Sequence, residues 1–250
     1  MWINVTILFA AVVVPGLIVL KLSSFSEKNL KLFLVFAGSY LFSMTVIHLI
    51  PDLFLSGTNP FNLGLYILIG FFIQKVLENY TNGVEHGHIH HHEGHNQSVL
   101  YILIALGIHS FLEGSIMTDS LHSNHLPDSV YAHGSSPKVL LGIVMHKIPA
   151  AIALMALLVL QFKNKSKAFG LLLIFALSSP LGLFTSEYLT HQNILPENYL
   201  VIFFAVVTGS FLQISTTIFI ESNPHHKMDW QKLFVSLIGA GAAVGAQMVF

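Results

Sequence analysis

Residues 98–118 read SVLYILIALGIHSFLEGSIMT, an apolar stretch long enough to cross a membrane that nevertheless carries His109 and Glu113. About 20 apolar residues span the hydrocarbon core of a bilayer as a helix. Residues four apart share a helix face, so the two side chains project side by side. Each ionisable group costs roughly 2.5–3.5 kcal/mol at the bilayer centre. The stretch therefore predicts a membrane helix whose polar pair has partners on another helix.

Seven further apolar windows extend along the chain, in which 54% of residues are hydrophobic and 9% are charged. A soluble domain of this length needs far more charged surface. Together the windows cover approximately 3–20, 31–50, 61–78, 98–118, 139–160, 167–189, 198–220 and 232–250. We therefore predict an all-α integral membrane protein, a bundle of eight transmembrane helices that forms a single domain over 1–250. It is expected in the cell membrane as a multi-pass protein.

The basic residues predict the orientation of the bundle. Of eleven basic residues, all lysines, all but Lys138 and Lys147 flank odd-numbered connections. Because lysine is enriched on the cytoplasmic side, these connections are predicted to be cytoplasmic and both termini extracytoplasmic. The formal net charge of −1 argues against a nucleic-acid partner. The chain has no cysteine, so any metal must bind to histidine or to oxygen ligands.

Two connections and one helix end carry further candidate metal ligands. The third connection, 79–97, is predicted to be a cytoplasmic loop whose six histidines can chelate transition metals: His86, His88, His90, His91, His92 and His95. Candidates for a metal entrance on the outer side are Met44, His48, Asp119, His122 and His125. For His48 an interfacial hydrogen bond is an equally good interpretation, and for Met44 core packing is the better one.

A second polar group lies in the fifth window, where His146 precedes Lys147. With a rise of about 1.5 Å per residue, Glu113, His109 and His146 fall roughly 8, 14 and 11 Å below the outer surface. Two histidines and a carboxylate at one depth form a plausible ligand set for Zn²⁺ or Fe²⁺. In the alternative interpretation, the Lys147 ammonium pairs with Glu113 and neutralises the group without a metal. Glu113 is taken as the only central carboxylate of the spans, with Glu187 near an outer end.

Four short motifs, in this order and topology, resemble the ZIP (Zrt/Irt-like) family of metal transporters over nearly the whole chain. They are HLIPD at 48–52, HSFLEG at 109–114, HKIPA at 146–150 and SPLG at 179–182. The resemblance implies transport of divalent transition metals into the cytoplasm, usually zinc and sometimes iron, manganese or cadmium. It also implies a site between the fourth and fifth helices, with His109, Glu113 and His146 as ligands.

The chain departs from the family pattern where many members hold a second metal. Their polar or acidic ligands are replaced here by Ser110, Lys147, Ala150 and Ser179. We therefore predict one transported metal, with the Lys147 ammonium in the second position. Repulsion from Lys147 would lower metal affinity unless Glu113 lies between the two cations.

The sequence thus favours a transporter, which is not an enzyme, has no catalytic cofactor and carries Zn²⁺, or Fe²⁺, Mn²⁺ or Cd²⁺, as its substrate. Its other partner is the lipid bilayer, and a homodimer is compatible with the sequence. One alternative is an intramembrane zinc-dependent hydrolase, in which the metal activates water. A second alternative is a metal-sensing or storage protein, in which the loop histidines matter and the central site is only structural.

Overall fold

The computed structural model describes residues 2–21, 27–81, 99–117, 137–192, 194, 197–222 and 229–249, which are helical apart from short turns and contain no strand. The helices are α1 (Trp2–Lys21), α2 (Glu27–Met44), η1 (Thr45–Leu49), α3 (Ile50–Leu55), α4 (Pro60–Thr81), α5 (Val99–Ser115), α7 (Pro137–Phe162), α8 (Lys165–His191), α9 (Glu197–Ser222) and α10 (Trp230–Val249). The predicted all-α fold is confirmed.

Six of the described helices are long and apolar enough to cross a membrane, and α5 is apolar but shorter. Large apolar side chains on the outside of the bundle, such as Phe61, Phe72 and Phe234, are exposed. In a soluble protein such side chains would face water, whereas in a bilayer they meet hydrocarbon. The chain is therefore a multi-pass membrane protein of the all-α class. The count of eight spans and the position of the termini remain predictions.

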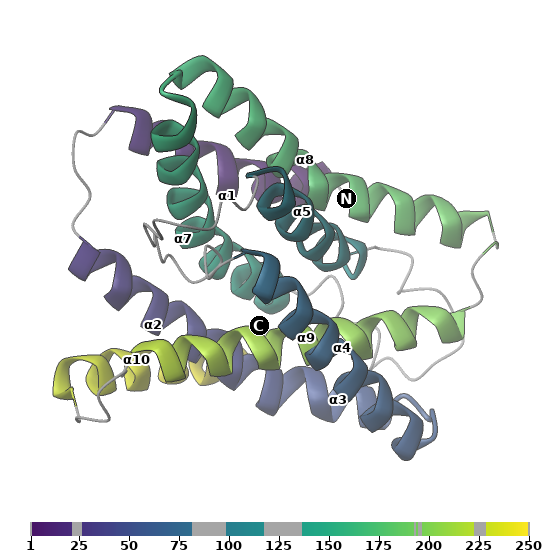
Figure 1. Ribbon diagram of the computed structural model, residues 1–250. Coiled ribbons are helices and arrows are strands. Elements are labelled where there is room, and N and C mark those ends of the chain that lie inside the picture. The colour runs from purple at the N-terminus through teal and green to yellow at the C-terminus, as the bar shows by residue number, and fades with distance from the viewer. Residues whose placement is uncertain are drawn as a thin grey trace.

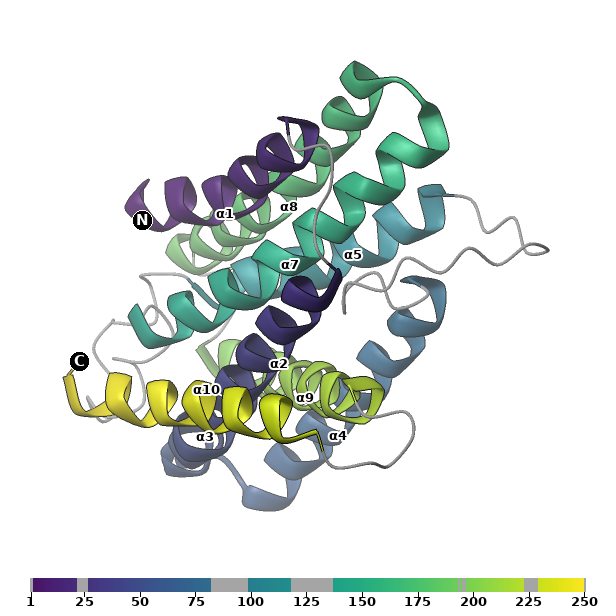
Figure 2. The same ribbon diagram turned by 90° about the vertical axis from the view of Figure 1, so that its left-hand side faces the viewer.

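The helices form two groups that meet near the middle of the molecule (Figures 1 and 2). In one group α1 packs on α7 and α8, and α5 packs on α8. In the other group α4 packs on α9, while α2 packs on α10 and on α9. The contact between α2 and α7 joins the two groups. Polar side chains of α5 and α7 that face this junction are thereby removed from lipid.

Two glycines bring α5 and α8 into close backbone contact. A Cβ atom on Gly114 would overlap the backbone of Ser179, and one on Gly182 would overlap that of Phe111. Small residues at such positions let membrane helices approach closely, which strengthens dispersion contacts and interhelical hydrogen bonds. The reciprocal contact fixes the position of α5, and with it the position of Glu113, relative to α8.

The second helical segment is longer and less regular than the predicted window 31–50. It runs from Glu27 to Leu55 and is π-helical over Thr45–Leu49. π-Bulges of this kind are rare and often lie at functional sites. The helix before the histidine-rich connection is also longer than expected, since α4 continues to Thr81 and so includes the first residues of the predicted loop 79–97.

Candidate metal centre

The three residues predicted as metal ligands lie together in the interior. His109 and Glu113 come from α5 and His146 from α7, and all three side chains are buried. One ligand atom from each lies within 4.8 Å of the others. The His109 Nε2 atom is 2.8 Å from Glu113 Oε1, and His146 Nε2 also contacts Glu113 Oε1. None of these three atoms has a hydrogen-bond partner of acceptable geometry.

The orientation of His146 is set by the backbone of its own helix. Its Nδ1 atom lies 3.0 Å from the carbonyl oxygen of Gly142, to which a protonated Nδ1 donates. That tautomer leaves a lone pair on Nε2, the atom that faces Glu113. Metal-binding histidines commonly donate their second N–H to a carbonyl in this way. The ring also packs edge-on against Phe211 of α9, with centroids 5.9 Å apart.

Lys147 occupies the other side of Glu113. Its Nζ atom donates to Glu113 Oε2 at 2.6 Å and to Ser110 Oγ at 2.7 Å, and the side chain is only 2% exposed. Glu113 thus turns one oxygen to the two histidines and the other to the ammonium. The carboxylate lies between Lys147 and the histidines, which reduces repulsion between Lys147 and a bound cation.

Of the remaining substituted positions, Ser179 contacts Ser110, and Ala150 lies on the same helix as Lys147. Ser179 Oγ is 2.8 Å from Ser110 Oγ and also 2.8 Å from the Ser110 carbonyl oxygen, to which it donates. Ala150 is buried one turn along α7 from Lys147. Lys147 Nζ lies 5.8 Å from the ring centroid of Phe175, which adds a weak cation–π contact. The ammonium of Lys147 thus has the Glu113 carboxylate as its counter-charge and the Ser110 hydroxyl as a second acceptor.

Of the predicted entrance residues, the structure describes Met44 and His48, whereas Asp119, His122 and His125 lie outside the described residues. His48 is buried in η1 and its Nδ1 lies 3.2 Å from Asp52 Oδ2. Whether His48 makes an interfacial hydrogen bond or lies on a metal pathway stays a prediction. Met44 packs in the core, and its Sδ lies against Gly142, one turn from His146. The six loop histidines, His86 to His95, also lie outside the described residues.

Glu78 is a buried carboxylate that the sequence interpretation missed. It lies near the end of α4, where Oε2 accepts from Lys75 Nζ at 2.7 Å and from Gln213 Nε2 at 2.5 Å. Gln213 in turn donates to Thr217 Oγ1 at 2.9 Å. Glu187 is therefore not the only helix carboxylate besides Glu113, because Glu78 in α4 and Asp52 in α3 are buried as well. The Lys75–Glu78 spacing, i and i+3 at the end of an apolar window, was the signal available.

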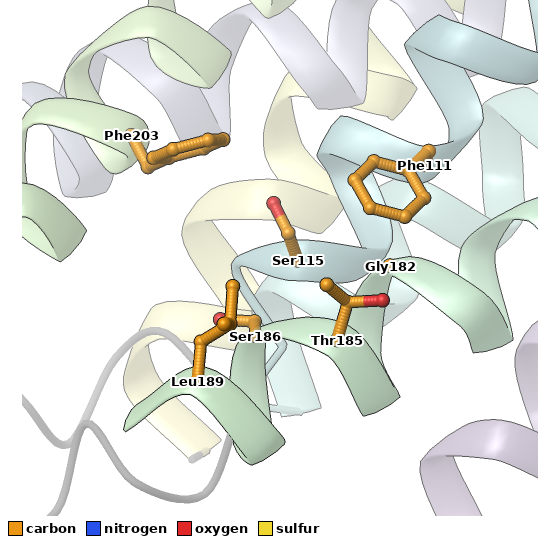
Figure 3. A pocket seen from close by; sticks show the side chains of 7 residues that line it. All are labelled: Phe111, Ser115, Gly182, Thr185, Ser186, Leu189 and Phe203. Atoms are coloured by element: carbon orange, nitrogen blue, oxygen red, sulfur yellow. The ribbon is translucent and has the colours of Figure 1, made fainter. Parts of the chain in front are cut away.

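A small cavity of about 70 Å³ is formed by residues of α5, α8 and α9 (Figure 3), and none of His109, Glu113 and His146 lines it. It is lined by Phe111, Ser115, Gly182, Thr185, Ser186, Leu189 and Phe203. The Ser115 hydroxyl donates to the Leu112 carbonyl at 2.7 Å, so it is turned to its own helix. The exposed walls are almost entirely hydrocarbon. The cavity therefore supplies no ligands for a metal.

The fold and this cluster define a class: a multi-pass, all-α membrane protein with a buried His–Glu–His group in its interior. No protein-family model matches the chain, and no curated protein matches its sequence. Any further assignment must therefore come from the chemistry of the residues themselves.

Proposed function

We propose that the protein transports divalent transition metal ions, with zinc as the best-fitting substrate, into the cytoplasm through one site formed by His109, Glu113 and His146. The observation that carries the proposal is the convergence of three buried ligand atoms, which lie within 4.8 Å of one another. Such ligand atoms are costly to bury in a membrane interior unless they share a proton or a metal ion. Two imidazole nitrogens and a carboxylate oxygen suit Zn²⁺ and leave a coordination position for water or another donor.

The charge balance favours a transport site over a permanent structural one. Glu113 and Lys147 together are neutral, and the two histidines bind metal as neutral rings, so a bound divalent ion keeps its full charge of +2. A resident structural zinc is normally held by enough ligands and charge to be closed. Here the ammonium limits affinity, which suits an ion that must leave again.

The same contacts favour a site for one metal ion rather than two. The second oxygen of Glu113 is already bound by Lys147 at 2.6 Å, and Ser110 by the same ammonium at 2.7 Å. The motif resemblance to ZIP transporters points to the same position and the same direction of transport. The intramembrane hydrolase is the weaker proposal, because Glu113 is committed to this group and the buried Glu78 lies at the contact of α4 with α9.

Deletion of residues 86–95 tests the transporter proposal against metal sensing or storage. We expect vesicles that contain the deletion variant to retain most zinc uptake, because the buried cluster is intact. The reverse pattern, in which the deletion abolishes function while His109→Ala leaves it unchanged, would support a sensor or storage protein. The measurement is the initial rate of radiolabelled zinc accumulation, normalised to the amount of protein in the vesicles.

A further inference from the structure

Four lysines gather at one end of the unit formed by α1, α7 and α8, which lie side by side (Figure 2). Lys21 ends α1, and the other three lie at the turn from α7 to α8; we call the set of Lys21, Lys163, Lys165 and Lys167 the lysine corner. The Nζ atom of Lys165 donates to the Leu20 carbonyl at 3.3 Å, which brings the turn against the end of α1. All four side chains are exposed.

No carboxylate neutralises the lysine corner from its own helices. The sequences of α1, α7 and α8 contain a single acidic residue, Glu187, which is 22 residues after Lys165 and so about 33 Å away along α8. Lysines on α4 and α10 behave differently. Lys75 lies 2.7 Å from Glu78, and Lys232 lies 3.7 Å from Asp229.

The turn that carries the lysines is well defined. Lys163 adopts a positive φ of 50°, and the Asn164 side chain caps α8 by accepting from the Lys167 N–H at 3.1 Å. Lys165 and Lys167 therefore stand in the first turn of α8, where the helix dipole disfavours cations. Stability of the helix alone does not account for lysines at these positions.

We propose that the lysine corner binds the headgroup of an anionic phospholipid from the adjoining leaflet. Clustered basic residues at the cytoplasmic end of membrane helices attract anionic lipid surfaces, and ammonium groups are donors for phosphate oxygens. The long aliphatic stems of lysine reach from the helix end to the headgroup level. The Lys167 ammonium makes a cation–π contact with its neighbour Phe162, with Nζ 4.3 Å from the ring centroid. This proposal does not depend on what the protein transports.

The test measures the lipid that stays with the full-length protein after extraction from vesicles of neutral phospholipid with a minor fraction of phosphatidylglycerol. We expect the natural chain to retain phosphatidylglycerol above its fraction in the vesicles. Lys165→Gln with Lys167→Gln should lower that enrichment roughly tenfold, since each lysine near the surface contributes to the attraction. Lys165→Arg with Lys167→Arg should preserve it. Retained lipid is quantified by mass spectrometry.

The matched control removes two lysines that have carboxylate partners. Lys75→Gln with Lys232→Gln changes the net charge equally, and Glu78 keeps its hydrogen bond from Gln213. We expect this variant to retain phosphatidylglycerol like the natural chain. Equal enrichment in the Lys165/Lys167 glutamine variant and the natural chain would overturn the proposal and leave the lysines a role in orientation alone. Equal loss in the control would also overturn it. A monodisperse elution profile identifies the variants that have folded.

Discussion

His109→Ala or His146→Ala is expected to weaken zinc binding to the purified protein by at least roughly 100-fold. Loss of a neighbour that only orients a ligand already costs 10–100-fold in metal affinity, and loss of one of three protein ligands should cost no less. The histidines are the informative positions because removing either one leaves the ion pair between Glu113 and Lys147 intact. Glu113 holds Lys147 at 2.6 Å, so its removal alone would leave a buried ammonium without its counter-charge. Breaking such a pair destabilises a protein by about 3–5 kcal/mol.

The matched control is His191→Ala, which removes an exposed histidine at the end of α8. Its zinc affinity should equal that of the natural chain, as measured by isothermal titration with the protein in detergent. Unchanged affinity in both cluster variants would contradict the ligand assignment. It would instead support the interpretation in which Lys147 and Glu113 form a structural interhelical pair.

Lys147→Glu is expected to raise the number of zinc ions bound per chain from one to two. The ammonium now donates to Glu113 Oε2 and to Ser110 Oγ, and Ser179 Oγ lies 2.8 Å from Ser110 Oγ. A carboxylate in its place would offer an oxygen ligand and free the second oxygen of Glu113. Without metal, the two buried carboxylates repel each other, so the variant should also gain more thermal stability from added zinc than the natural chain does.

The neutral variant Lys147→Met separates the effect of a lost cation from that of an added ligand. We expect it to bind one zinc ion, more tightly than the natural chain, because repulsion from the ammonium is gone. Bound zinc is counted by equilibrium dialysis with elemental analysis and located by anomalous diffraction. Two bridged metals in the natural chain at the level of Glu113 would contradict the single-metal account.

The polar pattern of the sequence anticipated much of this arrangement. Helical spacing alone placed His109 beside Glu113, and depth counting from the helix ends placed His146 at the same level. The structure brings these residues together, and Lys147 pairs with Glu113, which is the contact that the metal-free interpretation of the same residues predicted. The predictions from spacing and from depth agree with the structure because ionisable side chains in lipid need polar partners, and only side chains at the same depth can supply them.

Other features depend on which helices meet, which spacing within one helix does not encode. Glu78 is buried because α4 packs on α9 and brings Gln213 to its carboxylate. The π-helical stretch at 45–49 has no signal in composition or periodicity. Gly114 could be taken for an ordinary small residue until α8 is placed against it. Each of these requires the tertiary arrangement.

The most direct test of the account is uptake of radiolabelled zinc by proteoliposomes that contain the purified chain. The natural chain and His191→Ala should accumulate zinc at equal rates. His109→Ala, His146→Ala and the charge-balanced pair Glu113→Gln with Lys147→Met should fall to the rate of empty vesicles. The charge-balanced pair matters because it removes the carboxylate without leaving a buried ammonium. Zinc uptake by these three variants at the natural rate would contradict the proposal that the ion passes through the His109–Glu113–His146 site.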